Sequence, residues 1–304
     1  MHNLIKNELI KIFSKKSIYI IMLVMLFFVI GTNYLYKNKI DEFGNFIDND
    51  INKENYLEIA RKETDSDEEK LINKYILDTK YNINKRNDLR GILLNLFVEY
   101  DLFIILFSVL IPSIIITDEF NKGTIKQLLI TPNSRFKIML SKFIASLIMI
   151  LFSIIVLIIL ELIIGGIFLS YSSLKVPAVF YNYRTNTLSV YNIFTYLLLL
   201  ILNKMPMFII LDIIVLLISI LTLNSAISIS AGLLLYIFNP IINSLAISLK
   251  PLNYFISCHW DLSIYMFSNT TNNFNMSIAM IILYIFIMLF IIFRVFGKKD
   301  IKNI

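Results

Sequence analysis

The chain has 304 residues, of which 57% are hydrophobic and only 16% are charged, and this composition is too apolar for a soluble domain of its size. Solidly apolar runs of about 18 residues or more recur, each long enough to cross the ~30 Å hydrocarbon core of a bilayer as a helix. Such runs exclude a membrane β-barrel, whose strands would alternate polar and apolar residues. The net charge of +6 comes from basic residues that lie beside the apolar runs, so it gives no indication of nucleic-acid binding. The single cysteine excludes an internal disulfide.

The sequence therefore predicts an all-α polytopic membrane protein with six transmembrane helices in one transmembrane domain, 1–304. Residues 1–17 are predicted to form a cytoplasmic interfacial helix, because apolar residues recur there at helical spacing, namely Leu4, Ile5, Leu9, Ile12 and Phe13. The first span, 18–36, is too long for the apolar core of a signal peptide. No small-x-small cleavage site follows it, so we expect it to remain uncleaved.

Residues 37–94 are predicted to form a small helical extracytoplasmic element. Ser66 and Glu69 have the spacing of a capping box, and an apolar stripe continues at helical period through Leu71, Ile72, Tyr75 and Ile76. A solvated hairpin and a cap that gathers substrate both fit this segment.

The later spans are predicted at 95–117, 138–169, 191–222, 225–248 and 276–296. The fourth of the six contains Pro206 and is too long for one upright helix. We therefore expect a shallow interfacial helix before Lys204, followed by the true span.

Four connecting segments complete the chain: a cytoplasmic loop at 118–137, outer segments at 170–190 and 249–275, and a cytoplasmic tail at 297–304. The segment 249–275 is rich in aromatic and apolar residues, which predicts a re-entrant or interfacial structure after Pro251 ends the fifth span.

The orientation follows from the basic residues. Segments 1–17, 118–142 and 294–304 together hold 13 basic and 4 acidic residues, and an even number of spans places all three on one side. The positive-inside rule makes that side the cytoplasm. The heavy use of Ile, Asn and Lys is typical of an AT-rich bacterial genome, so we expect a bacterial cytoplasmic membrane protein with both termini inside.

The loop 118–142 has the features of a short capped helix between two spans. Thr124 and Gln127 have capping-box spacing, Leu128 and Leu129 form a small apolar face, and Pro132 ends the helix. Gly123 would permit a positive φ or a close backbone approach. Such a basic, capped helix is suited to contact with a soluble partner, although a solvated basic loop is the plainer alternative.

This loop resembles that of the type-2 ATP-binding-cassette (ABC) permeases, whose pattern is an acidic residue, Gly-Thr, an apolar pair, Pro, Ser-Arg and a later Lys. The matching residues are Glu119, Gly123, Thr124, Leu128, Leu129, Pro132, Ser134, Arg135 and Lys142. The basic stretch 296–301 after the last span is a second, smaller match.

The resemblance implies that the loop is a coupling helix that docks into a separate P-loop ATPase subunit. The residues implied in coupling are Glu119, Gly123, Thr124, Lys126, Leu128, Leu129, Pro132 and Arg135. ATP and Mg would bind on that partner and no cofactor on this chain, which has no G-x-x-x-x-G-K-[ST] string. Because six spans are half of what such exporters use, the resemblance also implies a dimer, with itself or with a similar chain.

Three charged residues inside the apolar spans are candidates for a cargo pathway, because charges at membrane depth usually face protein or water. They are Glu161, Lys204 and Asp212. The alternative is that Lys204 reaches an interface while the two acids pair with neighbouring helices. No metal site is expected: His2 and His259 are far apart in sequence, and His259 is interpreted as an interfacial side chain near headgroups.

The function expected from the resemblance is ATP-driven export, with a peptide antibiotic or drug-like amphipath as cargo and antibiotic resistance or self-immunity as the role. The chain itself would be a transport subunit and not an enzyme. Export of an ion or a lipid-linked substrate is the alternative in the same class. A non-transporting membrane scaffold and an intramembrane enzyme are the alternatives from other classes.

Overall fold

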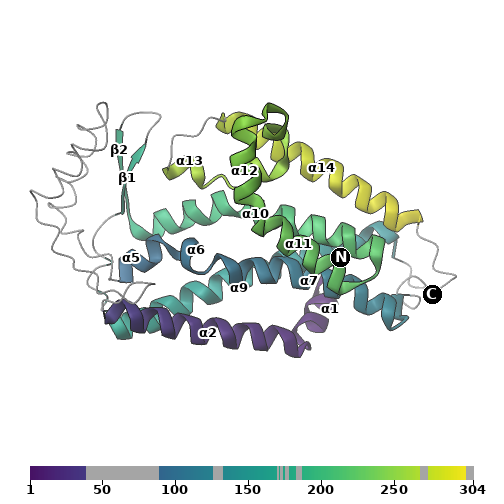
Figure 1. Cartoon of the computed structure of the whole chain (residues 1–304). Coiled ribbons are helices and arrows are strands. Elements are labelled where there is room, and N and C mark those ends of the chain that lie inside the picture. Colours follow the sequence, from purple (N-terminus) through teal and green to yellow (C-terminus); the bar gives the residue numbers. More distant parts are fainter. Residues whose placement is uncertain are drawn as a thin grey trace, which may run out of the picture.

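The computed structural model describes residues 1–38, 89–125, 133–169, 171, 174, 178–182, 187–267 and 273–298. These residues form a bundle of long helices with one small β-hairpin (Figure 1). Five helices are long and apolar enough to cross a membrane, and a bent helix pair brings the number to six. The all-α, multi-span architecture expected from the sequence is therefore confirmed.

The chain begins with α1 (His2–Phe13), and a bend at Ser14 and Lys15 leads into the first long helix, α2 (Lys16–Lys37). Ile12 of α1 packs with residues of α2, α7 and α9 in one apolar cluster. The helix predicted for the first residues is thus present and is attached to the bundle. The capping-box and stripe residues predicted between Ser66 and Ile76 lie outside the described part of the chain.

The second long helix begins later than the sequence predicted. Two short helices, α5 (Leu89–Leu94) and α6 (Leu96–Glu99), precede α7 (Asp101–Asn121). α7 is followed by α9 (Arg135–Leu169), whose 35 residues correspond to a length of roughly 52 Å. Beyond it, an antiparallel hairpin of β1 (Ala178–Asn182) and β2 (Thr187–Tyr191) pairs Phe180 with Ser189 at its centre.

One continuous helix, α10 (Ile193–Thr222), replaces the interfacial helix and separate span that were predicted for 191–222. The side chain of Asn192 accepts a hydrogen bond from the Phe194 amide and so caps its start. Pro206 is accommodated inside the helix. Lys204 does not need to reach water, because it is paired with two carboxylates inside the protein.

The predicted fifth span is broken. α11 (Ser225–Ile237) and α12 (Asn239–Ser248) meet at an angle of 45°, and Pro240 in the first turn of α12 has no amide hydrogen to continue the ladder of α11. The break thus comes earlier than Pro251.

The outer segment that follows α12 contains only short helices, at Lys250–Tyr254, Ile256–Cys258 and α13 (Ile264–Phe267). The last long helix, α14 (Phe274–Lys298), follows. Trp260 is fully buried, so this irregular backbone is covered by protein, as expected for such a segment.

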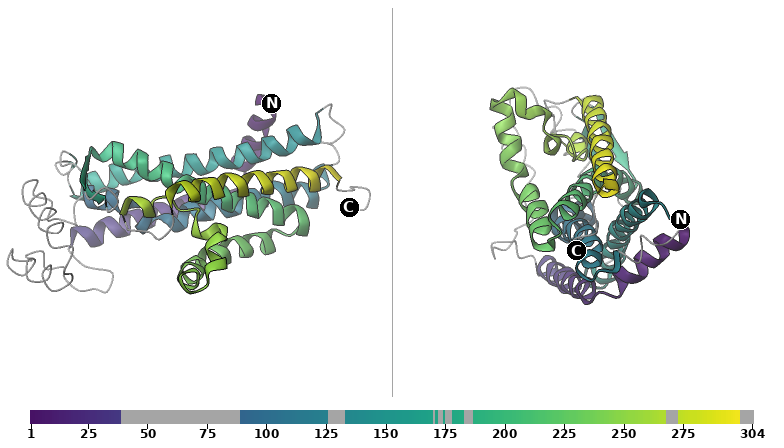
Figure 2. Two further views of the ribbon diagram at one scale, coloured as in Figure 1. Left: turned by 90° about the horizontal axis from the view of Figure 1, so that it is seen from above. Right: turned by 90° about the vertical axis from the view of Figure 1, so that its right-hand side faces the viewer.

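α7 and α10 form the centre of the bundle and bury most of their residues, whereas α2 and α14 keep large apolar side chains exposed. The views in Figures 1 and 2 place α1, the end of α7, the start of α9 and the end of α14 at one end of the bundle. The hairpin and α5 lie at the opposite end. The basic segments that the sequence assigned to one side of the membrane thus gather at one end.

Candidate functional site

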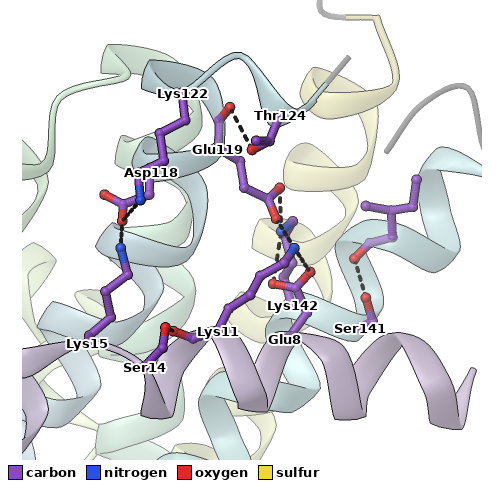
Figure 3. A network of polar contacts seen from close by, with 11 residues as sticks. Glu8, Lys11, Ser14, Lys15, Asp118, Glu119, Lys122, Thr124, Ser141 and Lys142 are labelled. Atoms are coloured by element: carbon purple, nitrogen blue, oxygen red, sulfur yellow. Dashed lines mark hydrogen bonds and ion pairs between the residues drawn. The ribbon is translucent and has the colours of Figure 1, made fainter. Parts of the chain in front are cut away.

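Four charged side chains from three helices form a closed ring beside the loop that connects α7 and α9. Glu8 and Lys11 lie three residues apart and so share one face of α1. Glu119 lies in the last turn of α7, and Lys142 lies about two turns into α9. The ring therefore joins the N-terminal helix to both helices that flank the loop (Figure 3).

Positive and negative groups alternate around this ion-pair ring. The Lys11 Nζ atom lies 2.6 Å from Glu119 Oε1 and 3.1 Å from Glu8 Oε1. The Lys142 Nζ atom lies 2.6 Å from Glu119 Oε2 and 3.1 Å from Glu8 Oε2. Each carboxylate thus bridges both ammonium groups, and the ring is neutral as a whole.

Burial makes the ring electrostatically significant. Lys142 is wholly buried and Glu8 and Glu119 are 4% and 5% exposed, whereas the side chain of Lys11 is about half exposed. Burial lowers the pKa of Lys11, but the hydrogen bonds and negative charges of Glu119 and Glu8 outweigh it and raise that pKa above its ordinary value. The raised pKa keeps Lys11 protonated within the ring.

A second group of charges occupies the other side of α7. Asp118 forms ion pairs with Lys15, at the start of α2, and with Lys122, at 3.8 Å. Adjacent acids at the end of one helix thus point in different directions, Asp118 toward α2 and Glu119 toward α1 and α9 (Figure 3).

The start of the loop has the conformation that its residue types favour. Gly123 adopts a φ of +68°, one of the two roles expected for it, and ends α7. The Thr124 hydroxyl donates back to the Glu119 carbonyl at 3.4 Å, and Ile125 is buried. The residues predicted to dock the ATPase, Lys126, Leu128, Leu129 and Pro132, lie outside the described residues, so the predicted helix remains a prediction.

Two predicted coupling residues are engaged within the protein. The buried carboxylate of Glu119 belongs to the ion-pair ring, and the Arg135 guanidinium donates to the Gly297 carbonyl at 2.8 Å. Arg135 thus joins the start of α9 to the end of α14. Both ends of the loop are anchored to other helices.

The predicted cargo-pathway residues do not come together. The Glu161 carboxylate is buried and accepts two hydrogen bonds. The Asn33 amide of α2 donates at 3.0 Å, and the hydroxyl of Tyr100, just before α7, donates at 2.9 Å. Asp212 is buried and accepts from Ser146 of α9 at 2.9 Å. The two acids therefore pair with neighbouring helices, the alternative raised by the sequence.

Lys204 is also paired internally, with Asp261 at 2.7 Å and Asp101 at 3.5 Å. Its side chain is only 13% exposed, and it contacts a different part of the protein from Asp212. Tyr236 of α11 donates to Asp101 at 3.3 Å, so this cluster joins α7, α10, α11 and the outer segment.

His259 is wholly buried within the protein, so its side chain does not face headgroups as the sequence predicted. Its Nε2 lies 2.6 Å from the Asn253 carbonyl and its Nδ1 lies 2.7 Å from the Ser277 hydroxyl. The carbonyl can only accept, so Nε2 carries the hydrogen and Nδ1 accepts from Ser277. Among the described residues, no group of His, Cys, Asp and Glu side chains is arranged to hold a metal ion.

Glu8, Lys11 and Asp118 were not predicted from the sequence as site residues. Glu8 offered a signal, because its position places it between Leu4, Ile5, Leu9 and Ile12 on the apolar side of a short helix. An acid on that face requires a buried partner.

Comparison with known families decides the affiliation of the chain. The profile described as "Protein of unknown function (DUF2705)" matches residues 64–302. The chain belongs to the DUF2705 family. That match includes α7, the loop and α9, but not α1.

Among curated proteins, the chain is similar to "Uncharacterized protein YhcI" of Bacillus subtilis (strain 168), with 26% identity over 204 residues. The similar region covers 65% of this chain and 64% of that relative, so the chain spans less than two thirds of the relative's length. No solved structure matches this DUF2705 protein.

Proposed function

We propose that this DUF2705 protein is the permease subunit of an ATP-driven ABC exporter in a bacterial cytoplasmic membrane. A separate P-loop ATPase subunit would bind ATP and Mg and would dock on the loop between α7 and α9. Two permease copies, identical or similar, would form the membrane pathway. The multi-span fold and the resemblance of the loop support this proposal.

The observation that carries the proposal is the ion-pair ring beside the loop. A loop that receives force from a partner must pass that force to the spans without unfolding its own ends. Glu119 and Lys142 join the end of α7 to the start of α9 at 2.6 Å, and Glu8 and Lys11 add α1 to the same unit. The end of α7 and the start of α9 are thus held together at the point where a partner would push.

The lengths of the two helices suit the transmission of movement. α9 extends over roughly 52 Å, well beyond the ~30 Å hydrocarbon core, and α7 is packed in the centre of the bundle against α10. A displacement of the loop would tilt these helices as rigid bodies. In an alternating-access cycle, ATP binding on the partner would favour one tilt over the other.

The cargo that best fits the resemblance is a peptide antibiotic or a drug-like amphipath, with an ion or a lipid-linked substrate as the alternative. Glu161, Lys204 and Asp212 are engaged with protein groups in this conformation. They would meet cargo only in a second conformation in which those pairs separate. A membrane scaffold, by contrast, would bind an ATPase without moving any cargo.

The test is a pull-down of the tagged full chain from the native membrane, with the captured proteins identified by mass spectrometry. A Leu128→Glu, Leu129→Glu variant alters the predicted docking face. Val98→Glu is the matched control, since Val98 is 80% exposed and lies in α6, away from the ion-pair ring. We expect a P-loop ATPase with the wild type and the control, and its loss with the loop variant.

A wild-type chain that captures no ATPase, or a loop variant that captures it equally well, would refute this use of the loop. A Lys142→Met variant then separates docking from force transmission, provided that circular dichroism of the purified chain shows that it is folded. It should still bind the ATPase while its ATP-dependent cargo movement declines, and unchanged movement would show that the ring plays no part.

A further inference from the structure

A cavity of about 490 Å³ lies between α1, the start of α2 and the second half of α7. Its volume falls within the range of roughly 300–1,000 Å³ that is usual for small-molecule sites. It lies on the Asp118 side of α7, and Glu8, Lys11 and Glu119 of the ion-pair ring also line it. The proposed docking of an ATPase on Leu128 and Leu129 does not use this cavity.

The walls of this cavity change from apolar to charged along the bundle. Its apolar part includes Ile21 of α2 and Phe107, Leu110 and Ile114 of α7. From Phe107 to Asp118 the helix rises by about 16 Å, which is close to half of the ~30 Å hydrocarbon thickness and hence to the depth of one leaflet. The cavity is thus apolar over a leaflet's depth and polar at one end.

The polar end has an excess of positive charge. The ion-pair ring borders it but is neutral, since two carboxylates face two ammonium groups. Beside it, the single carboxylate of Asp118 is shared by Lys15 and Lys122. Each ammonium has three hydrogen-bond donors, and the Lys122 side chain is 65% exposed, so donors and one net positive charge remain for an anion.

We propose that this cavity binds one glycerophospholipid of the surrounding bilayer, in the leaflet on the side of the termini. Its phosphate lies at Lys15 and Lys122, and an acyl chain extends along the apolar residues of α2 and α7. Both parts of the cavity are matched by one molecule, and the bilayer supplies that molecule at the same depth. A free phosphate would leave the apolar part in contact with water.

The lipid site depends only on membrane insertion, so it stands or falls separately from the ATPase partner. The experiment uses the purified full chain in detergent, after exhaustive exchange, with retained phospholipid quantified by mass spectrometry. Isotope-labelled phosphatidylglycerol is then titrated back and bound complexes are counted by native mass spectrometry. Labelled glycerol phosphate serves as the probe without acyl chains.

Two variants and two controls test the two ends of the site. Ile114→Trp fills the apolar part, and Leu102→Trp on the same helix is its control, because Leu102 is exposed and does not line the cavity. Lys122→Gln removes one ammonium, and Lys137→Gln changes an exposed lysine of α9.

We expect about one phospholipid per wild-type chain, and affinity for phosphatidylglycerol reduced about tenfold or more by Lys122→Gln and by Ile114→Trp. Both controls should bind like the wild type. If Ile114→Trp does not fold, Leu110→Trp and Lys122→Gln test the same two ends.

Three results would overturn the proposal. The wild type could retain and rebind no phospholipid above the background of empty micelles. Both cavity variants could bind as the wild type does. Glycerol phosphate could bind as tightly as phosphatidylglycerol, in which case the site takes a free phosphate and the apolar part contributes nothing.

Discussion

Replacing Lys142 with Met should destabilise the protein more than any other conservative change in the ion-pair ring, because its ammonium is wholly buried between two carboxylates. Unit charges at 2.6 and 3.1 Å attract each other by about 6 and 5 kcal/mol at an effective dielectric constant of about 20. Desolvation of the buried ions offsets several kcal/mol of this attraction. Without Lys142, Glu8 and Glu119 would face only the half-exposed Lys11. We expect a loss of about 3–5 kcal/mol in the free energy of unfolding.

A double-mutant cycle separates the interaction from other effects of the substitution. Glu119→Gln alone leaves an uncompensated positive charge, and Lys142→Met alone leaves an uncompensated negative charge. The double variant removes one of each, so its loss should be smaller than the sum of the two single losses by about 2 kcal/mol or more.

Unfolding of the full chain in mixed detergent micelles, followed by circular dichroism over a denaturing-detergent titration, measures these differences. Lys137→Met is the control, because Lys137 is exposed on the same helix, and it should change little. Strictly additive losses in the double variant would refute the reasoning, since they would mean that the two charges do not interact.

Three further predictions concern the rest of the bundle. Gly165→Ala should destabilise the protein by about 1–3 kcal/mol, because the new methyl would lie 2.5 Å from Leu89 Cδ1 and 2.9 Å from Glu161 Oε1. Gly31→Ala, with nothing within 4 Å, should be neutral or slightly stabilising. Equal effects of the two variants in unfolding titrations would contradict this. Tyr100→Phe should cost about 1–3 kcal/mol in the same titrations, because the buried Glu161 carboxylate loses one of its two donors, the Tyr100 hydroxyl at 2.9 Å. An unchanged midpoint would count against that bond. Burial lowers the pKa of His259 below the ~6.5 of a free histidine, so the folded state should lose stability as pH falls below that value. Thermal melts from about pH 8 to pH 5 should show this slope in the wild type and not in His259→Gln, and identical slopes would contradict it.

The number and type of the long helices could be predicted from sequence, because an uninterrupted apolar run in a bilayer has few structures other than a helix. The positive φ at Gly123 was also predictable, because a glycine just after a helix either adopts a positive φ or permits a close backbone approach. These features depend on neighbouring residues and need no knowledge of distant contacts.

The continuity of α10 could not be predicted, because it depends on contacts between distant parts of the chain. The sequence leaves two places for Lys204, a cargo pathway or an interface. Its partners, Asp101 and Asp261, lie 103 and 57 residues away in the sequence and pair with it inside the protein.

The same limit applies to the candidate site. Glu119 belongs to the loop that resembles the type-2 ABC permeases, and it was therefore expected to contact a partner protein. Whether a carboxylate at a helix end points outward or inward depends, however, on what packs beside it. Lys142 approaches from α9 and Lys11 from the N-terminal helix, and neither contact has a local sequence signature. The one readable signal was Glu8, an acid on the apolar side of an amphipathic helix.

The proposed docking of an ATPase is tested most directly by photo-crosslinking in the native membrane. A photoreactive amino acid placed at Leu128 in the loop should give an adduct that contains a P-loop ATPase, whereas the same amino acid at Val98 in α6 should give none. An ATPase adduct from position 128 alone would support the permease assignment. No such adduct from position 128, or equal adducts from both positions, would contradict it.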